Sequence, residues 1–315
     1  MNRRAILIFL LCVAFGAMAD AQCLSSVNPV GGTENLLVLE KNALRIISFY
    51  KYGQGKHYFE KDSRSDFSLI RKAQYNYLSG IIGYGLSHRI TLETEFGYYI
   101  NKSQHYATEP EYTLTGRGLT NLVVSSKVNL YTNHIKRVYF SAAGGVKIPF
   151  SRTPQEVDHV ELPVEVQPTI GAYGFVFSSY FVKENSERAL RFFITNRVET
   201  NLRNPEDYHL GTAVFTSFFV SKHLMFQWLK GDWTTILQFR NEIRTHDHIG
   251  DRLKESSGGA IFLVAPQINY VVQEKWYLSA MADIPVYQYF NGTQLGAGIG
   301  ATLSLSRTFS LGAGL

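Results

Sequence analysis

Charged and amide side chains occupy every second position in several segments of the chain. Between residues 238 and 244, Gln, Arg, Glu and Arg stand at the even positions, and Leu237, Phe239 and Ile243 stand at odd positions on the opposite face. Mixed charges on one face can set the selectivity of a polar passage, or they can pair and fill a narrow space. Eleven residues make up this candidate polar face: Glu93, Glu95, Lys147, Arg191, Arg197, Glu199, Gln238, Arg240, Glu242, Arg244 and Asp283.

Histidines offer a second kind of chemistry. His246 and His248 flank Asp247, and on a strand the two rings would share a face, as paired metal ligands must. They stand where a strand gives way to a loop, and no third ligand is identifiable, so we expect no metal. Histidines at loop ends could instead serve a hydrolase at the outer rim: His57, His105, His159, His209 and His246.

The sequence lacks two motifs that are typical of enzymes, the phosphate-binding loop and the nucleophile elbow. Residues 53–56 (GQGK) lack the first glycine spacing and the Ser or Thr of a phosphate-binding loop. The sequence contains no Gly-x-Ser-x-Gly nucleophile elbow. We therefore expect neither an enzyme nor a cofactor, with the rim hydrolase as the minor alternative.

The polar face must be positioned by β-strands. A helix would separate Glu242 from Arg240 and Arg244, whereas a strand places all three on one face. The same alternation predicts about twelve strands, although ten or fourteen would also fit. They are 43–56, 70–86, 90–106, 118–131, 138–150, 167–181, 190–203, 208–221, 232–246, 259–272, 276–289 and 295–307.

The connections between these strands alternate between short turns and longer polar loops. This pattern is typical of a closed, antiparallel, up-and-down transmembrane β-barrel, whose loops are long on one side only. A secreted β-sandwich would also alternate, but its strands would usually be shorter than the 10 to 17 residues found here. The sequence thus predicts an all-β barrel over residues 43–315.

The N-terminal segment predicts export. Arg3 and Arg4 precede an uncharged, mainly apolar run over residues 5–19, and small residues lead to a cleavage site after Ala21. Residues 22–42 then form a periplasmic lead-in, which could also fold into the lumen. A membrane anchor is the alternative for the run, and a lipid on Cys23 the alternative for the new N-terminus. The net charge of +5 is mild and dispersed, so we expect no nucleic-acid partner.

The C-terminal hairpin carries a family resemblance. Residues 283–288 (DIPVYQ), followed by residues 291–296 (NGTQLG), resemble the last hairpin of transporter-type barrels related to the phenol-degradation meta-pathway family. Over residues 43–309 the chain is similar to outer-membrane β-barrels of Bacteroidetes-type bacteria. The resemblance implies the outer membrane of a Gram-negative bacterium. Barrels of this kind usually end on an aromatic residue, whereas here a short tail follows Phe309.

These observations lead to three functional hypotheses. The first is passive or substrate-selective transport of small solutes through a polar lumen. The second is a structural or binding protein with a closed lumen, and the third is the rim hydrolase. The expected partners are outer-membrane lipids, an unidentified small solute and the barrel-assembly machinery. An open lumen would support transport, whereas a lumen closed by residues 22–42 or by a long loop would support the second hypothesis.

Overall fold

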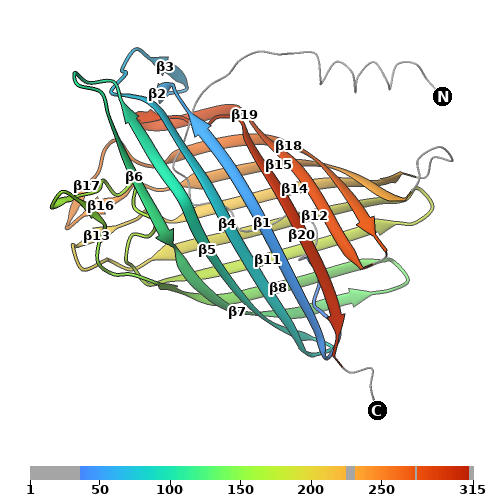
Figure 1. The fold of residues 1–315 in the computed structure, drawn as a ribbon. Coiled ribbons are helices and arrows are strands. Elements are labelled where there is room, and N and C mark those ends of the chain that lie inside the picture. Colours follow the sequence, from blue (N-terminus) through green and yellow to red (C-terminus); the bar gives the residue numbers. More distant parts are fainter. Residues whose placement is uncertain (1–35, 225–230, 274, 312–315) are drawn as a thin grey trace, which may run out of the picture.

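Twelve long strands form a closed barrel (Figure 1). The structure is a computed structural model, and it describes residues 36–224, 231–273 and 275–311. The predicted all-β barrel is confirmed. Its strands are β1 (Ala43–Gly55), β4 (Ile70–Ser87), β5 (Ile90–Tyr106), β7 (Asn121–Asn133), β8 (Val138–Pro149), β11 (Gly174–Asn185), β12 (Leu190–Asn201), β14 (Ala213–Leu224), β15 (Asp232–Arg244), β18 (Gly259–Val272), β19 (Trp276–Leu295) and β20 (Gly300–Ser310).

Each of these strands pairs antiparallel with its neighbours around the ring. The first strand, β1, pairs with β4 on one side and with the last strand, β20, on the other. The ring runs on from β20 through β19 to β18, so the sheet has no open edge among these strands. Closure in this way gives each backbone N–H and C=O a partner in a neighbouring strand.

The strand between β5 and β8 is interrupted. The short strand β6 (Tyr112–Leu119) and β7 both pair with β5, and Thr120 lies between them. The backbone N–H of Thr120 donates to Gly97 O at 2.9 Å, and Gly118 has a φ of +133°. The predicted strand 118–131 therefore corresponds mainly to β7, which together with β6 forms one longer strand bent at Thr120.

Three other predicted boundaries are wrong. The strand predicted at 167–181 begins only at Gly174, because residues 162–170 fold inward at the barrel mouth and bury Leu162 and Val166. The strand predicted at 208–221 begins at Ala213, since Tyr208 pairs in a separate small sheet. The last hairpin turns at residues 296–299 rather than at 290–294, because β19 extends to Leu295.

Within the described ranges of the chain, seven short strands lie at the end of the barrel that carries the long loops. They are β2 (Tyr58–Lys61), β3 (Ser63–Ser65), β9 (Glu156–Val157), β10 (Val160–Glu161), β13 (Tyr208–His209), β16 (His248–Ile249) and β17 (Arg252–Leu253). In Figure 1, β2 and β3 and the β13–β16–β17 group lie at the end opposite the start of β1 and the finish of β20. This end is called the outer end below, and the other the short-turn end.

The outer face of the barrel is apolar. Large hydrophobic side chains on it remain exposed, among them Phe96 on β5, Phe177 on β11, Phe218 on β14 and Leu237 on β15. Their neighbours in sequence point inward, as period-two alternation requires. In the described part of the chain, no helix has the length and apolar character of a membrane span.

The predicted signal peptide (1–21) lies outside the described residues. Of the predicted lead-in 22–42, the structure describes the last part, from Leu36 onward. Leu36 and Leu39 are both buried, at 3% and 4% exposure, inside the ring of strands. Residues 36–42 therefore enter the lumen before the first strand begins.

Candidate functional site: the barrel lumen

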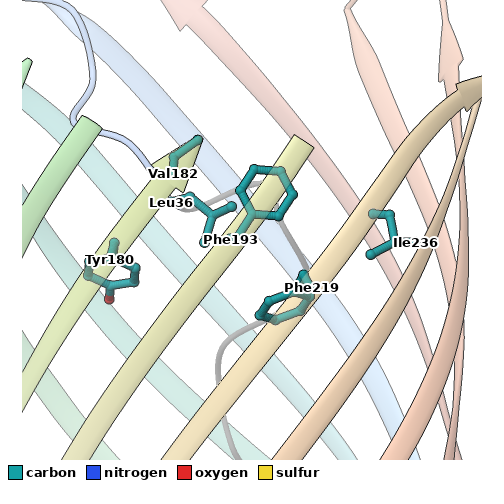
Figure 2. Close-up of a cluster of buried hydrophobic side chains, with 6 residues drawn as sticks. All are labelled: Leu36, Tyr180, Val182, Phe193, Phe219 and Ile236. Atoms are coloured by element: carbon teal, nitrogen blue, oxygen red, sulfur yellow. The ribbon is translucent and has the colours of Figure 1, made fainter. Parts of the chain in front are cut away.

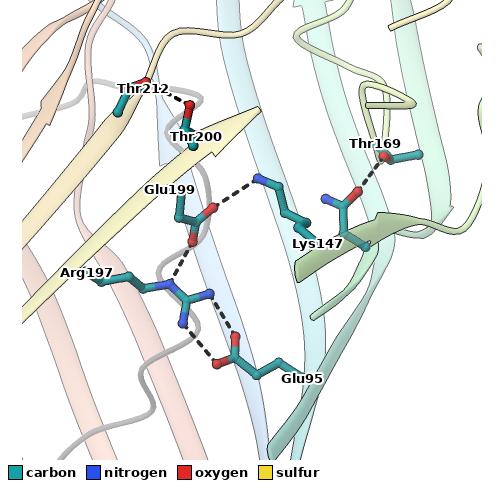
Figure 3. Close-up of polar contacts among 8 residues, drawn as sticks. Glu95, Lys147, Thr169, Arg197, Glu199, Thr200 and Thr212 are labelled. Atoms are coloured by element: carbon teal, nitrogen blue, oxygen red, sulfur yellow. Dashed lines mark hydrogen bonds and ion pairs between the residues drawn. The ribbon is translucent and has the colours of Figure 1, made fainter. Parts of the chain in front are cut away.

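An ion-paired cluster crosses the lumen (Figure 3). Arg197 on β12 places Nη1 and Nη2 each 2.9 Å from an oxygen of Glu95 on β5, and its Nε lies 2.8 Å from Glu199 Oε1. The other oxygen of Glu199 lies 3.2 Å from Lys147 Nζ on β8. Three strands separate β12 from β5 in the ring, so Arg197 spans the interior rather than linking neighbours.

A second cluster joins the strands on the other side of the ring. Arg240 on β15 lies 2.9 Å from Asp283 Oδ1 on β19 through Nη2, and its Nε lies 2.7 Å from Glu242 Oε1. Lys51 on β1 places Nζ 3.0 Å from Asp283 Oδ2. Asp283 is thus shared by two cations from two different strands.

Two lysines of this network escaped the sequence analysis. Lys127 on β7 places Nζ 2.7 Å from Glu93 Oε1 and 4.5 Å from the ring centroid of Tyr180. Lys51 is the other. Each is a single charge with uncharged neighbours in sequence, and only the phase of the strand alternation could have assigned it to the interior.

The network is neutral and buried. Its ten members are Lys51, Lys127, Lys147, Arg197, Arg240, Glu93, Glu95, Glu199, Glu242 and Asp283, five cations and five anions, and none is more than 8% exposed. In a wide water-filled pore these groups would be exposed. At their level the lumen is therefore filled by side chains that pair with one another, and removing one partner would leave an uncompensated buried charge.

The remaining members of the candidate face lie apart from this network. Gln238 is buried and donates from Nε2 to Ser217 Oγ at 2.9 Å. Arg191 is exposed at the short-turn end, where its Nε lies 3.0 Å from Glu184 Oε1. Arg244 lines two cavities at the outer end. The structure thus places eight of the eleven residues in three buried ion-paired groups and leaves three outside them.

The two outer cavities meet at shared residues. One has a volume of about 250 Å³ and mixes aromatic walls such as Tyr106 and Phe290 with polar groups. The other, of about 180 Å³, reaches down to Arg197. Both are lined by Glu165, Arg244 and Asp247.

Glu165 belongs to the loop that folds into the mouth. Lys254 Nζ on the facing loop donates to Glu165 Oε1 at 2.8 Å. Burial alone would raise the pKa of the Glu165 carboxyl, but the ammonium of Lys254 outweighs it, so that the pKa lies below its usual value. Lys102 Nζ on β5 donates to Gln167 O of the same loop at 2.8 Å, which ties the loop to the barrel wall.

Asp247 is held by neutral donors. It accepts the hydroxyl of Tyr208 and the backbone N–H of Gly211, the latter at 2.8 Å. Burial and the hydrogen bond to the Asp247 carboxylate raise the pKa of Tyr208 well above its usual value. These contacts fix the small sheet around β13 and β16 over the outer cavities.

The histidines at the rim take part in loop structure. The rings of His209 and His248 lie 6.0 Å apart, and His246 Nδ1 lies 3.3 Å from Lys254 O. Among the residues that the structure describes, no group of three or more His, Cys, Asp or Glu side chains could hold a metal ion.

Solved structures with a similar fold were found by comparison. An outer membrane channel from Pseudomonas putida F1 superimposes with a TM-score of 0.65 at 11% sequence identity, over 88% of this chain and 99% of that one. The chain has the fold of an outer-membrane β-barrel. The β domain of the Bordetella autotransporter BrkA has a TM-score of 0.48 at 8% identity, over 85% of this chain and 100% of that one. No protein-family model and no curated protein matches the chain.

Proposed function

We propose that this protein is an outer-membrane barrel that passes small polar solutes selectively, through a lumen that is closed at rest. The closed ring of antiparallel strands and its apolar outer face support a membrane location. On this proposal the signal peptide is cleaved near Ala21, the barrel-assembly machinery inserts residues 43–315, and lipids of a Gram-negative outer membrane surround them. Kinship with the phenol-degradation meta-pathway family belongs to the same proposal.

One observation carries the transport proposal. The neutral ion network lies between the cavities of the outer end and a cavity of about 560 Å³ at the short-turn end. A solute that enters from outside must therefore displace paired side chains to cross. Because the network has no net charge, it favours no ion by sign, and selection would depend on the ability to replace these hydrogen bonds.

The packed lumen also favours a second function. A barrel closed by the ion network, by residues 162–170 and by Leu36–Leu39 suits a structural or binding protein whose outer loops contact a surface partner. Passive diffusion through an open pore is the version of transport that the burial of the network supports least.

Conductance in planar bilayers tests these functions. The parent should show low conductance, whereas Glu95→Ser combined with Arg197→Ser should conduct at least about tenfold more. This pair removes one anion and one cation, so the lumen stays neutral while Glu199 keeps Lys147.

The matched control is Arg203→Ser with Asp207→Ser. It removes an ion pair of the same kind, 2.8 Å long, from an exposed loop and should leave the conductance unchanged. If neither the parent nor the lumen variant conducts, the transport proposal falls and the closed-lumen function replaces it. A parent with large ohmic conductance would instead disprove closure at rest.

A further inference from the structure

The segment Leu36–Asn42 crosses the lumen at the short-turn side of the ion network. Leu36 packs against apolar side chains of four consecutive strands of the ring, β11, β12, β14 and β15 (Figure 2). These residues, called the seat below, are Tyr180, Val182, Phe193, Phe219 and Ile236. Leu39 lies against β4 and β5, on the far side of the ring.

The wall under Leu39 and Glu40 is shaped to receive the chain. A Cβ on Gly85 would stand 1.9 Å from Glu40 O, and one on Gly83 would stand 3.3 Å from Leu39 Cδ1. The backbone N–H of Leu39 donates to Thr91 Oγ1 at 2.8 Å, and that of Asn42 donates to Gly85 O at 2.8 Å. Glycine at position 85 is therefore required for this close approach.

The seat is unusual for the interior of a polar barrel. Its side chains point inward and yet are apolar, and Leu36 covers them. If the segment left, these side chains would face water, at a cost proportional to their apolar area. The seat thus provides a specific driving force for holding the segment in the lumen.

No strand pairing holds the segment in place. Residues 36–42 belong to no strand of the barrel, and a cavity of about 560 Å³ adjoins Leu36 and Leu37. Leu37 is 36% exposed, in contrast to its buried neighbour. The cavity offers space into which the segment can move without unpairing a strand.

We propose that Leu36–Glu40 is a displaceable stopper that regulates passage through the lumen, held shut by insertion of Leu36 into the seat. This inference rests on the proposed transport function. It assigns to the end of the lead-in a regulatory role, and to the seat the role of an intramolecular binding site for one leucine side chain.

Thiol labelling tests the stopper without relying on transport. Val182→Cys is nearly isosteric, and Val182 is 1% exposed in the seat. With Cys23→Ser, position 182 holds the one thiol of the exported chain. In this background Leu36→Asp should raise the rate of labelling by a small charged methanethiosulfonate at least about tenfold, since a buried leucine shifts such an equilibrium by that order.

The matched control is Leu37→Asp, the same change one residue along at the exposed position. It should alter the labelling rate less than about twofold. Heat-modifiable gel mobility of each variant reports that the barrel has folded, and Leu36→Ala provides a milder version should Leu36→Asp fail this check. Equal labelling rates in the folded Leu36 and Leu37 variants would overturn the stopper.

A cross-link connects the stopper to passage. Leu36→Cys and Phe193→Cys, joined by a short bis-methanethiosulfonate in the Glu95→Ser, Arg197→Ser, Cys23→Ser background, should suppress conductance, and a reductant should restore it. If that background conducts and the cross-link changes nothing, the stopper is overturned while the transport proposal stands. If labelling responds to Leu36→Asp but no variant conducts, transport falls and the displaceable segment remains.

Discussion

Arg197 on β12 holds both carboxylate oxygens of Glu95 on β5 at 2.9 Å, across the interior of the barrel. The two residues are 102 positions apart in the chain, and three strands separate them in the ring. The bidentate geometry matches the planar fork of the guanidinium to a carboxylate. The contact therefore braces opposite walls, and its loss should affect the whole barrel.

The brace should make single substitutions costlier than the double one. Arg197→Gln leaves Glu95 and Glu199 buried beside a single remaining ammonium, that of Lys147, and should lower the free energy of unfolding by about 3–5 kcal/mol. Glu95→Gln with Arg197→Gln keeps the lumen neutral and should cost less than the sum of the single changes. Urea unfolding in detergent micelles, arranged as a double-mutant cycle, measures the coupling. Additive costs would contradict the brace.

The two faces of β15 should respond oppositely to a new charge. Leu237 is exposed on the apolar outer face, so Leu237→Arg should cost about 2–4 kcal/mol in the membrane and block assembly. Thr234→Arg lies on the inward face beside the cavity of about 560 Å³ and should assemble. Heat-modifiable mobility of outer-membrane fractions compares them, and equal assembly would refute the assignment of faces.

One glycine of the wall should not tolerate a methyl group. A Cβ on Gly97 would stand 1.9 Å from the Tyr77 hydroxyl, whose ring packs 4.9 Å from that of Tyr99. Gly97→Ala should lower the free energy of unfolding by about 1–3 kcal/mol, because the tyrosine must move. Gly144→Ala is the control, since its nearest neighbour would be 3.7 Å away. Similar losses for both would show that strand propensity, rather than the clash, sets the cost.

The loop in the mouth should loosen in acid. The pKa of Glu165 is depressed by Lys254, so its ionised form stabilises the folded loop above the usual glutamate pKa and loses this contribution as pH falls through the depressed value. Both side chains are partly exposed, so the contribution should stay below about 1 kcal/mol. Thermal unfolding of the parent and Glu165→Gln should differ at pH 7 and converge below about pH 4. A gap that is independent of pH would show that the bridge adds no stability.

The strand count and the inward face could be predicted from the sequence because both depend on local alternation. Arg240, Glu242 and Arg244 reveal their shared face within five residues. The role of this face depends on which side chains stand opposite it in the barrel. No local sequence pattern predicts that Arg197 pairs with Glu95, 102 positions away. Lys51 and Lys127 were missed for the same reason, since each is a lone charge whose partner lies on another strand.

The inward loop misled the prediction for a different reason. The strand predicted at 167–181 begins seven residues too early, and Gln167 and Ala172 in that stretch are indeed buried. They are buried by the barrel mouth rather than by sheet pairing, and period alone does not distinguish the two surroundings. A similar limit applied to Tyr208, whose partner is the small sheet at the outer end.

The seam between β1 and β20 sets the order in which the barrel can be made. Arg45 and Thr308 face each other across it although they are 263 positions apart, so this pairing must wait until residues 300–310 have been made. Until residues 300–310 arrive, β1 and β19 each offer an unpaired edge that invites association with other chains. An exported chain that lost those residues would expose two unpaired strand edges, those of β1 and β19, and would be prone to aggregation. Pairing of β20 is therefore the step that closes the barrel.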